Sequence, residues 1–271
     1  MNLELPAAAT EFGHAALNAF AAAGGVELAR QAELDPTTRQ SLVDPVLARL
    51  GVSDLDPTAD TESLAAAAEL CRVAGYFVLP YPVSAVVLGD RDDPLPFAVV
   101  APDAPFLHHG DLFSRWRVAS IDGRTWLVDR PAVVPDSLIT PFVATAPLTL
   151  EGPDRTAPSA TTVALGLALS AWQVLGTLEH ALELTVEHVQ TRQQFGQPLA
   201  RFQAVQFQIA DAIVAVSGLR ELAQYTVSGR DLSMQVLDSL ALRVHALEVA
   251  NQVLRTSHQL HGAIGFCDEH D

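Results

Sequence analysis

The segment 158–262 constrains the fold more than any other part of the chain, because its apolar residues recur at steps of three and four positions. Such spacing places them along one face of a long α-helix. A second helix is predicted over about Phe202–Val227 and a third from about Ser233 to Leu260, and short turns between such helices predict an antiparallel bundle. The residues predicted to face the core are Trp172, Leu175, Leu178, Leu182, Val186 and Val189 in the first helix, and Val205, Ile209, Ile213 and Val216 in the second.

Residues 1–89 are predicted to form a separate helical domain. An Ala-rich segment from Pro6 to Ala23 ends at two glycines, and Asp35 precedes a Pro-Thr-Thr sequence that is typical of a helix start. Asp60 or Thr61 is expected to cap a further helix that runs to about Ala74. Prolines at positions 80 and 82 then prevent easy continuation of the helix.

Residues 90–157 differ from both flanks, because prolines are dense and short apolar runs such as Phe97–Val100 alternate with turn residues. Arg117–Val128 is the best candidate for a hairpin, with two short strands around Asp122-Gly123. The predicted fold is therefore mainly α, with an N-terminal helical domain (1–89), a reduced central β domain (90–157) and a C-terminal antiparallel helical bundle (158–271).

The chain contains no lysine, since all 16 basic residues among its 271 are arginine, against 32 acidic ones. Schiff-base and P-loop lysine chemistry is thereby excluded, and arginine is the only permanent cation for binding phosphate. The net charge of −16 argues against nucleic acid or an anionic membrane as a partner, because both attract a basic surface.

Two scattered cysteines, Cys71 and Cys267, indicate neither a disulfide framework nor a zinc site. The N-terminal stretch carries acidic residues rather than the basic segment of a signal peptide. No apolar run is expected to reach the roughly 20 residues that span a bilayer. We expect a cytoplasmic protein that has no membrane partner.

The turn between the first two helices of the bundle, Thr191–Gln203, is the best candidate for a binding site. It combines the guanidinium of Arg192, the amides of Gln194 and Gln203, the ring of Phe195 and a Gly-Gln-Pro turn. Such groups suit a phosphate-bearing ligand or a partner chain. The alternative is that Arg192 only stabilises the C-terminal end of the preceding helix, where a cation is favoured.

This turn resembles a signature of the acyl-CoA dehydrogenase family, an arginine followed by Phe-Gly and later by a glutamine. Two other segments share the resemblance: the Ala-rich helix Leu64–Gly75 before a Pro-Tyr-Pro turn, and Gln259–Phe266, which is similar to the family's Gln-x-x-Gly-Gly-x-Gly segment. The order of helices, β unit and helical bundle also matches the three-part layout of the family. The resemblance thus implies an acyl-CoA dehydrogenase-like fold.

In that family, the segments that correspond to Thr191–Gln203 and Gln259–Phe266 contact an FAD that is held mainly by the neighbouring subunit. The resemblance implies that Arg192 meets the FAD pyrophosphate, that Phe195 packs beside the adenosine half, and that Gln203 bonds the same region. It further assigns Gln194, Gln259 and Gly262 to this end of FAD, with Ala263 standing where the family has a second glycine. A simpler role for Gly262 is that of a helix C-cap.

The family's catalytic glutamate has no counterpart at either of its known places. In register with the arginine motif, one place falls on Gly166, and no carboxylate occurs between Ala157 and Gln173. The other is a Glu-Gly-Thr-like turn that would follow the position of Asp271, so we expect neither base. A Thr-Glu-Pro-like loop that lines the flavin ring in the family has no counterpart in 90–157 either.

The resemblance is therefore to the shortened, non-catalytic subunits of α2β2 acyl-CoA dehydrogenases with which actinobacteria degrade steroid side chains, as in cholesterol catabolism. A partner subunit of the heterotetramer would supply the catalytic glutamate and bind most of the acyl-CoA. One alternative is a degenerate scaffold subunit that binds no FAD. Another is a self-sufficient homomeric dehydrogenase with an unrecognised base, such as Glu179 or Glu269.

Other ionisable groups have structural interpretations. Glu179, Glu183 and Glu187 recur every four residues on one helical face, which predicts a solvated or subunit-facing stripe. His180 and His188 flank this stripe without a spacing that indicates a metal site. The pair His108-His109 is expected in a solvent-exposed loop of the β domain.

Overall fold

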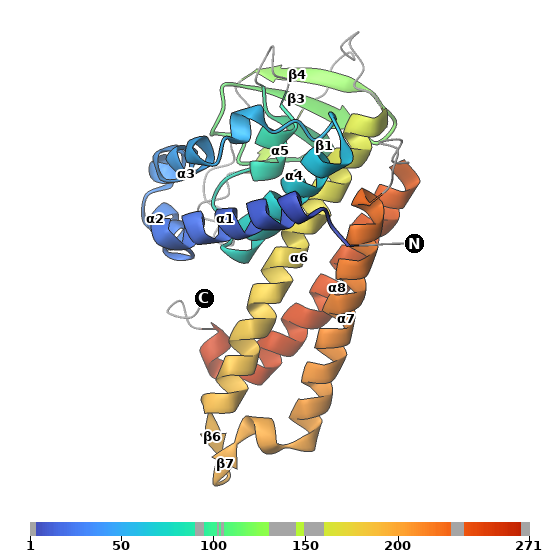
Figure 1. Ribbon diagram of the computed structural model, residues 1–271. Coiled ribbons are helices and arrows are strands. Elements are labelled where there is room, and N and C mark those ends of the chain that lie inside the picture. Colours follow the sequence, from blue (N-terminus) through green and yellow to red (C-terminus); the bar gives the residue numbers. More distant parts are fainter. Residues whose placement is uncertain are drawn as a thin grey trace.

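The computed structural model describes residues 4–89, 95–101, 103, 106–129, 145–148, 160–228 and 236–266. A group of helices and a small sheet lie at one end of three long helices, and the hairpin of β6 (Gln193–Gln194) and β7 (Gln197–Pro198) lies at the opposite end (Figure 1). The fold is mainly α, as predicted. The boundaries predicted at 89/90 and 157/158 fall at or beside residues outside these ranges, so the division into domains stays a prediction.

Three of the N-terminal helices lie where local signals predict them, whereas Glu27–Leu34 and Val83–Val87 were not predicted to be helical. The Asp60 carboxylate accepts a hydrogen bond from the Ser63 amide and caps α4, while the Asp35 carboxylate accepts one from the Thr37 amide. Gly24, with φ of 127°, ends α1. The helices are α1 (Ala7–Ala23), α2 (Glu27–Leu34), α3 (Arg39–Arg49), α4 (Thr61–Tyr76) and α5 (Val83–Val87).

The central strands include the predicted hairpin. Strand β3 (Arg115–Ser120) pairs antiparallel with β4 (Thr125–Asp129), and Gly123 in the turn has φ of 86°. Strand β1 (Phe97–Val100) pairs with β3 in parallel, so the three-stranded order is β1-β3-β4. Strands β2 (Phe106–His108) and β5 (Thr145–Pro147) form a separate antiparallel pair.

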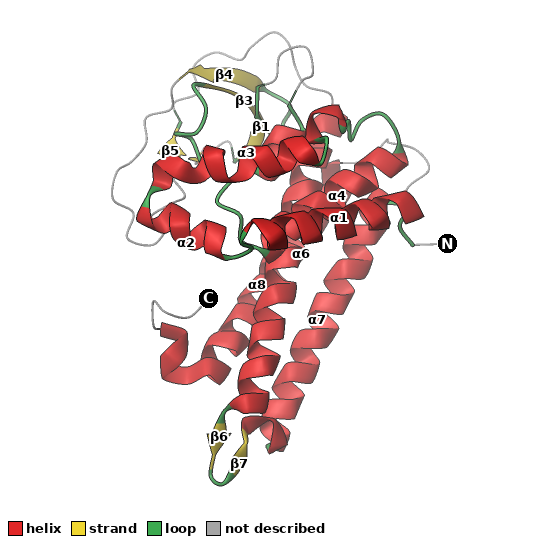
Figure 2. Ribbon diagram, turned by 60° about the vertical axis from the view of Figure 1, so that its left-hand side comes forward, coloured by secondary structure: helices red, strands yellow, loops and turns green. Residues whose placement is uncertain are grey.

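Three long helices form the C-terminal bundle: α6 (Ala160–Thr191), α7 (Gln203–Val227) and α8 (Val236–His261). Trp172, Leu175 and Leu178 are buried as predicted, and so is Val189. Helix α6 passes between the N-terminal helices and the rest of the bundle, as Figures 1 and 2 show. The prediction for Ile213 is wrong, because its side chain is 46% exposed on α7.

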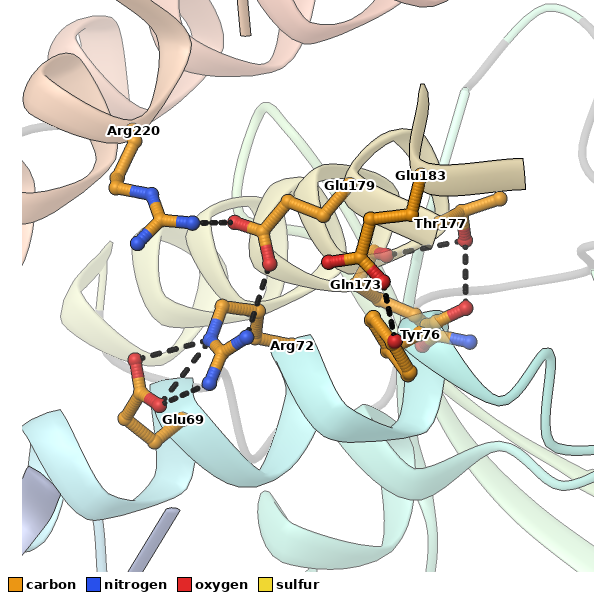
Figure 3. A network of polar contacts seen from close by, with 9 residues as sticks. Glu69, Arg72, Tyr76, Gln173, Thr177, Glu179, Glu183 and Arg220 are labelled. Atoms are coloured by element: carbon orange, nitrogen blue, oxygen red, sulfur yellow. Dashed lines mark hydrogen bonds and ion pairs between the residues drawn. The ribbon is translucent and has the colours of Figure 1, made fainter. Parts of the chain in front are cut away.

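Helices α4 and α6 cross so closely that only glycines fit at the contact. A Cβ atom on Gly176 would lie 1.8 Å from the carbonyl oxygen of Arg72, and one on Gly75 would lie 1.8 Å from that of Gln173. The Thr177 hydroxyl donates to the Gly75 carbonyl across the same crossing (Figure 3). This contact fixes the N-terminal helices against the bundle.

By length and composition, α6 passes for a membrane-spanning helix, so the expectation that no such stretch exists is wrong. In this structure, 61% of its most apolar window is buried. The apolar residues of α6 pack in a core cluster with residues of α4, α7 and α8. A helix that is apolar nearly all round is what the core of an α-helical protein requires.

Candidate functional site

The predicted turn at the far end of the bundle is a tight β-hairpin. Strand β6 (Gln193–Gln194) pairs with β7 (Gln197–Pro198), and Phe195 and Gly196 form the two-residue turn with φ of 52° and 79°. Two successive positive φ angles are typical of a type I′ turn. The Leu199 amide donates to the Arg192 carbonyl over 2.9 Å, so Arg192 stands at the base of the hairpin.

The hairpin presents its side chains to solvent. Phe195 is 90% exposed, and its ring meets that of Phe202 edge to face at 6.1 Å between centroids. Arg192, Gln194 and Gln203 are exposed too, and within the described ranges no hydrogen bond or ion pair engages the Arg192 guanidinium. Within the described residues, the Arg192 side chain therefore makes no hydrogen bond to the carbonyl groups at the end of α6. Its charge still lies directly after Thr191, the last residue of α6, where a cation is favoured, so the structure does not overturn the alternative.

The other predicted segment lies at the end of α8, beside the end of α6. Rings of His188 on α6 and His261 on α8 are 4.6 Å apart between centroids. Gln259 and Ala263 are exposed, and Gly262 ends α8 with φ of 64° and open space where a Cβ would point. The structure thus brings the Gln259–Ala263 segment to the same end of the bundle as Arg192.

These residues fit the adenosine-pyrophosphate end of FAD in their chemistry. An exposed guanidinium and exposed amides are suitable donors to a pyrophosphate, and a glycine without Cβ contacts admits a close backbone approach. The exposed Phe195 ring offers a flat apolar surface to an aromatic base. A phenylalanine with positive φ is rare and strained, and such strain is often retained for function.

The place of the family's catalytic base is filled with apolar side chains. A Cβ built on Gly166 would lie 2.7 Å from Cγ2 of Val99 and within 4 Å of Phe97 and Leu88. Strand β1 therefore packs directly on this turn of α6. A carboxylate side chain there would require the Val99 side chain or β1 to move, which agrees with the absence of a base at Gly166.

Glu179 is not part of a solvated stripe, and this prediction is wrong for it. Its side chain is 8% exposed, and both carboxylate oxygens are used: Oε2 accepts from Arg72 Nη1 at 2.9 Å and Oε1 from Arg220 Nη2 at 2.7 Å (Figure 3). Arg72 also bonds Glu69 at 2.7 Å. The network ties α4, α6 and α7 together, so Glu179 has a structural role.

No local signal in the sequence marks this network, because Glu179 lies 107 positions from Arg72 and 41 from Arg220. The next glutamate, Glu183, accepts a hydrogen bond from the Tyr76 hydroxyl. Burial, together with this bond, raises the pKa of Tyr76 to about 12. Glu183 and Glu187 are both exposed, as the stripe prediction required.

The histidine pair of the β domain is divided between solvent and core. His108 is exposed as predicted, whereas His109 is 8% exposed and has φ of 58°. Burial, with Arg39 and His108 nearby, lowers the pKa of His109 to about 3.

Burial also raises the pKa of the Cys71 thiol. In the described part of the chain, no three or more His, Cys, Asp or Glu side chains are grouped to hold a metal.

Comparison with known proteins supports the family assignment. The model of the acyl-CoA dehydrogenase C-terminal domain matches residues 160–271. The acyl-CoA dehydrogenase FadE27 of Mycobacterium tuberculosis is 32% identical over 113 residues, which are 38% of this chain and 30% of that protein. IpdE2 of the same organism is 27% identical over 169 residues, or 62% of this chain and 52% of that protein. The chain thus matches about a third to a half of the length of these relatives.

Solved structures of the family share the whole fold. In the ChsE4–ChsE5 complex from M. tuberculosis, one chain superposes with a TM-score of 0.75 at 18% identity, covering 100% of this chain and 90% of that one. A steroid acyl-CoA dehydrogenase, Tcur3481–Tcur3483, gives 0.73 at 22% identity, covering 95% and 87%. The chain therefore has the acyl-CoA dehydrogenase fold, and residues 160–271 match the acyl-CoA dehydrogenase C-terminal domain.

Proposed function

We propose that this chain is the non-catalytic subunit of a heteromeric acyl-CoA dehydrogenase. It would hold the adenosine-pyrophosphate end of an FAD whose flavin ring lies in a partner subunit. One contrast carries the proposal: the groups suited to FAD are exposed on the hairpin and at the end of α8, whereas the space around Gly166 is filled by Val99 and its neighbours.

Each named residue has a role that follows from its place. Arg192 would donate to the pyrophosphate, Gln194, Gln203 and Gln259 would add amide donors, and Phe195 would cover the adenine. Gly262, which has no Cβ, would let the backbone approach the phosphates, and Ala263 would lie beside it. FAD itself would accept the hydride removed from the acyl-CoA, and the partner would supply the base. Alone, this chain would be inactive.

The surface of the bundle supports a partner. Helices α7 and α8 leave large apolar side chains in solvent at helical spacing, and such surfaces commonly mark protein interfaces. On α7 and α8, the exposed residues include Phe207, Val214, Tyr225, Leu237, Val244, Leu247 and Leu254. An exposed apolar face that remains unpaired in the isolated chain is expected to be covered in an assembly.

The choice of a steroid substrate rests on the relatives. Two of the structures with this fold are two-protein complexes, and one of them is called a steroid acyl-CoA dehydrogenase. We infer a CoA ester of a steroid side chain, as in cholesterol catabolism, desaturated between its α and β carbons by an α2β2 heterotetramer. The acyl-CoA would lie mainly in the partner, since Phe97, Val99 and Leu88 fill the space beside Gly166 here.

The test compares this chain alone, a candidate partner encoded by a neighbouring gene, and the two co-expressed. Flavin absorbance and oxidation of steroid-CoA are read for each preparation. Flavin and activity that appear only in the mixture support the proposal. An active complex without flavin contacts from this chain, or a flavin-free complex, supports the scaffold alternative. Activity of this chain alone overturns the proposal.

A further inference from the structure

A cleft of about 460 Å³ lies between α6 and α7, beside the Glu179 network. Its floor is apolar and is formed by Leu182, Val186, Ile213 and Val216. Ser217 and Arg220 line the α7 side, and Glu183, Glu187 and Gln190 line the α6 side. An apolar floor beside a charged rim is the usual arrangement of a groove that receives an amphipathic helix.

The rim carries negative charge that the chain itself leaves unbalanced. Glu179 is neutralised by Arg72 and Arg220, whereas among the described residues Glu183 is bonded only to the neutral Tyr76 hydroxyl. Within the described ranges, no cation pairs with Glu183 or Glu187. Two carboxylates four residues apart on a helix repel each other and destabilise it. An unfavourable local interaction that no other group in the chain offsets, such as this repulsion, commonly marks a binding surface.

The floor indicates that the occupant also has an apolar side. Ile213 on the floor of the cleft is 46% exposed, although its position on α7 suits a core residue. Val216, which also lines the cleft, is only 6% exposed. Covering Ile213 with another apolar side chain would remove this surface from water and stabilise the contact. A small hydrophilic cation would satisfy the rim but not the floor.

We propose that this cleft receives an amphipathic helical segment of the partner subunit, with an apolar stripe and two Lys or Arg side chains one helical turn apart. The proposal rests on the proposed function, because the occupant belongs to that partner. A second copy of this chain is disfavoured as the occupant, because its net charge of −16 would be repelled by the acidic rim. The spacing of the two cations matches the rise of about 6 Å between positions i and i+4 of α6.

The experiment measures how tightly the partner subunit binds this chain when the rim charges are reversed. Glu183→Lys/Glu187→Lys is compared with Glu11→Lys/Glu33→Lys, which makes the same change in net charge at exposed positions on α1 and α2. We expect the rim variant to raise the Kd at least about tenfold and the control to change it little. Hydrogen exchange of the wild-type complex should show protection over 182–190 and 213–220.

A second variant distinguishes a loss of binding from a folding defect. Glu183→Gln/Glu187→Gln relieves the repulsion on α6, so it should fold at least as stably and still bind the partner more weakly than the wild type. If both rim variants bind like the wild type and the cleft gains no protection, the groove proposal is overturned while the proposed function stands. If the wild-type chain forms no complex, both proposals fail.

Discussion

The ring of His188 on α6 lies 4.6 Å from the ring of His261 on α8, tilted by 30°. His188 is one turn before Arg192, and His261 stands between Gln259 and Gly262. This one contact joins two segments that are some 70 positions apart in the sequence. Each of these segments carries candidate hydrogen-bond donors to FAD. The proposed site therefore depends on the packing of α8 against α6.

Replacing Phe195 with asparagine should separate stability from FAD binding. Asn-Gly is the preferred pair for a type I′ turn, and asparagine tolerates the φ of 52° better than phenylalanine does. We expect Phe195→Asn to raise the free energy of unfolding by up to about 1 kcal/mol and to lower FAD occupancy of the complex. Urea unfolding and flavin absorbance check this, and a loss of stability with full occupancy would contradict it.

Gly176→Ala should be strongly destabilising, because its Cβ would lie 1.8 Å from the Arg72 carbonyl oxygen and force α4 away from α6. We expect a loss of about 3 kcal/mol or more. Gly218→Ala on α7 is the matched control, since nothing lies within 4 Å of a Cβ there. That variant should gain about 0.5–1 kcal/mol from helix propensity. Thermal unfolding of the two variants should therefore shift in opposite directions.

Glu179→Gln should be far more harmful than Glu187→Gln on the same helix. Glu179 is 8% exposed between two guanidinium groups, and removing its charge leaves Arg72 without one of its two carboxylate partners. Breaking a buried ion pair costs about 3–5 kcal/mol, whereas an exposed substitution stays within about 0.5 kcal/mol. Equal unfolding midpoints for the two variants in urea would show that the network contributes nothing.

The buried His109 should make the free energy of unfolding sensitive to acid. Its pKa is lowered from 6.5 to about 3, so between these pH values the unfolded chain binds a proton that the folded chain does not. The contribution of His109 is fully present above about pH 6.5 and is lost as the pH falls, by up to about 1.4 kcal/mol per pH unit. His109→Asn, which suits the positive φ, should flatten this part of the curve; an unchanged slope argues against the depressed pKa.

Local features of the fold could be predicted from the sequence. Asp60 caps its helix through its own carboxylate, and Asp122-Gly123 makes its own turn, so a few neighbouring residues determine each feature. The parallel pairing of β1 with β3 could not be predicted, because it joins segments that are distant along the chain.

The residues of the candidate site stay a prediction, whereas the structure adds a shape that the sequence did not predict. A glycine at the second position, such as Gly196, favours a two-residue hairpin turn. The preceding Phe195 argues against such a turn, because phenylalanine rarely takes a positive φ. The burial of Glu179 could not be predicted either. The side chains that neutralise it come from α4 and α7, and helical periodicity describes only α6.

The decisive measurement is the FAD affinity of the assembled complex when Arg192 of this chain is replaced by alanine. Loss of a charge-assisted bond to a pyrophosphate should weaken binding by about 10- to 100-fold. Arg49→Ala, an exposed arginine on α3, is the matched control and should bind FAD as the wild type does. Equal FAD affinity for wild type and Arg192→Ala, in complexes of equal stability, would show that Arg192 does not bind the FAD pyrophosphate.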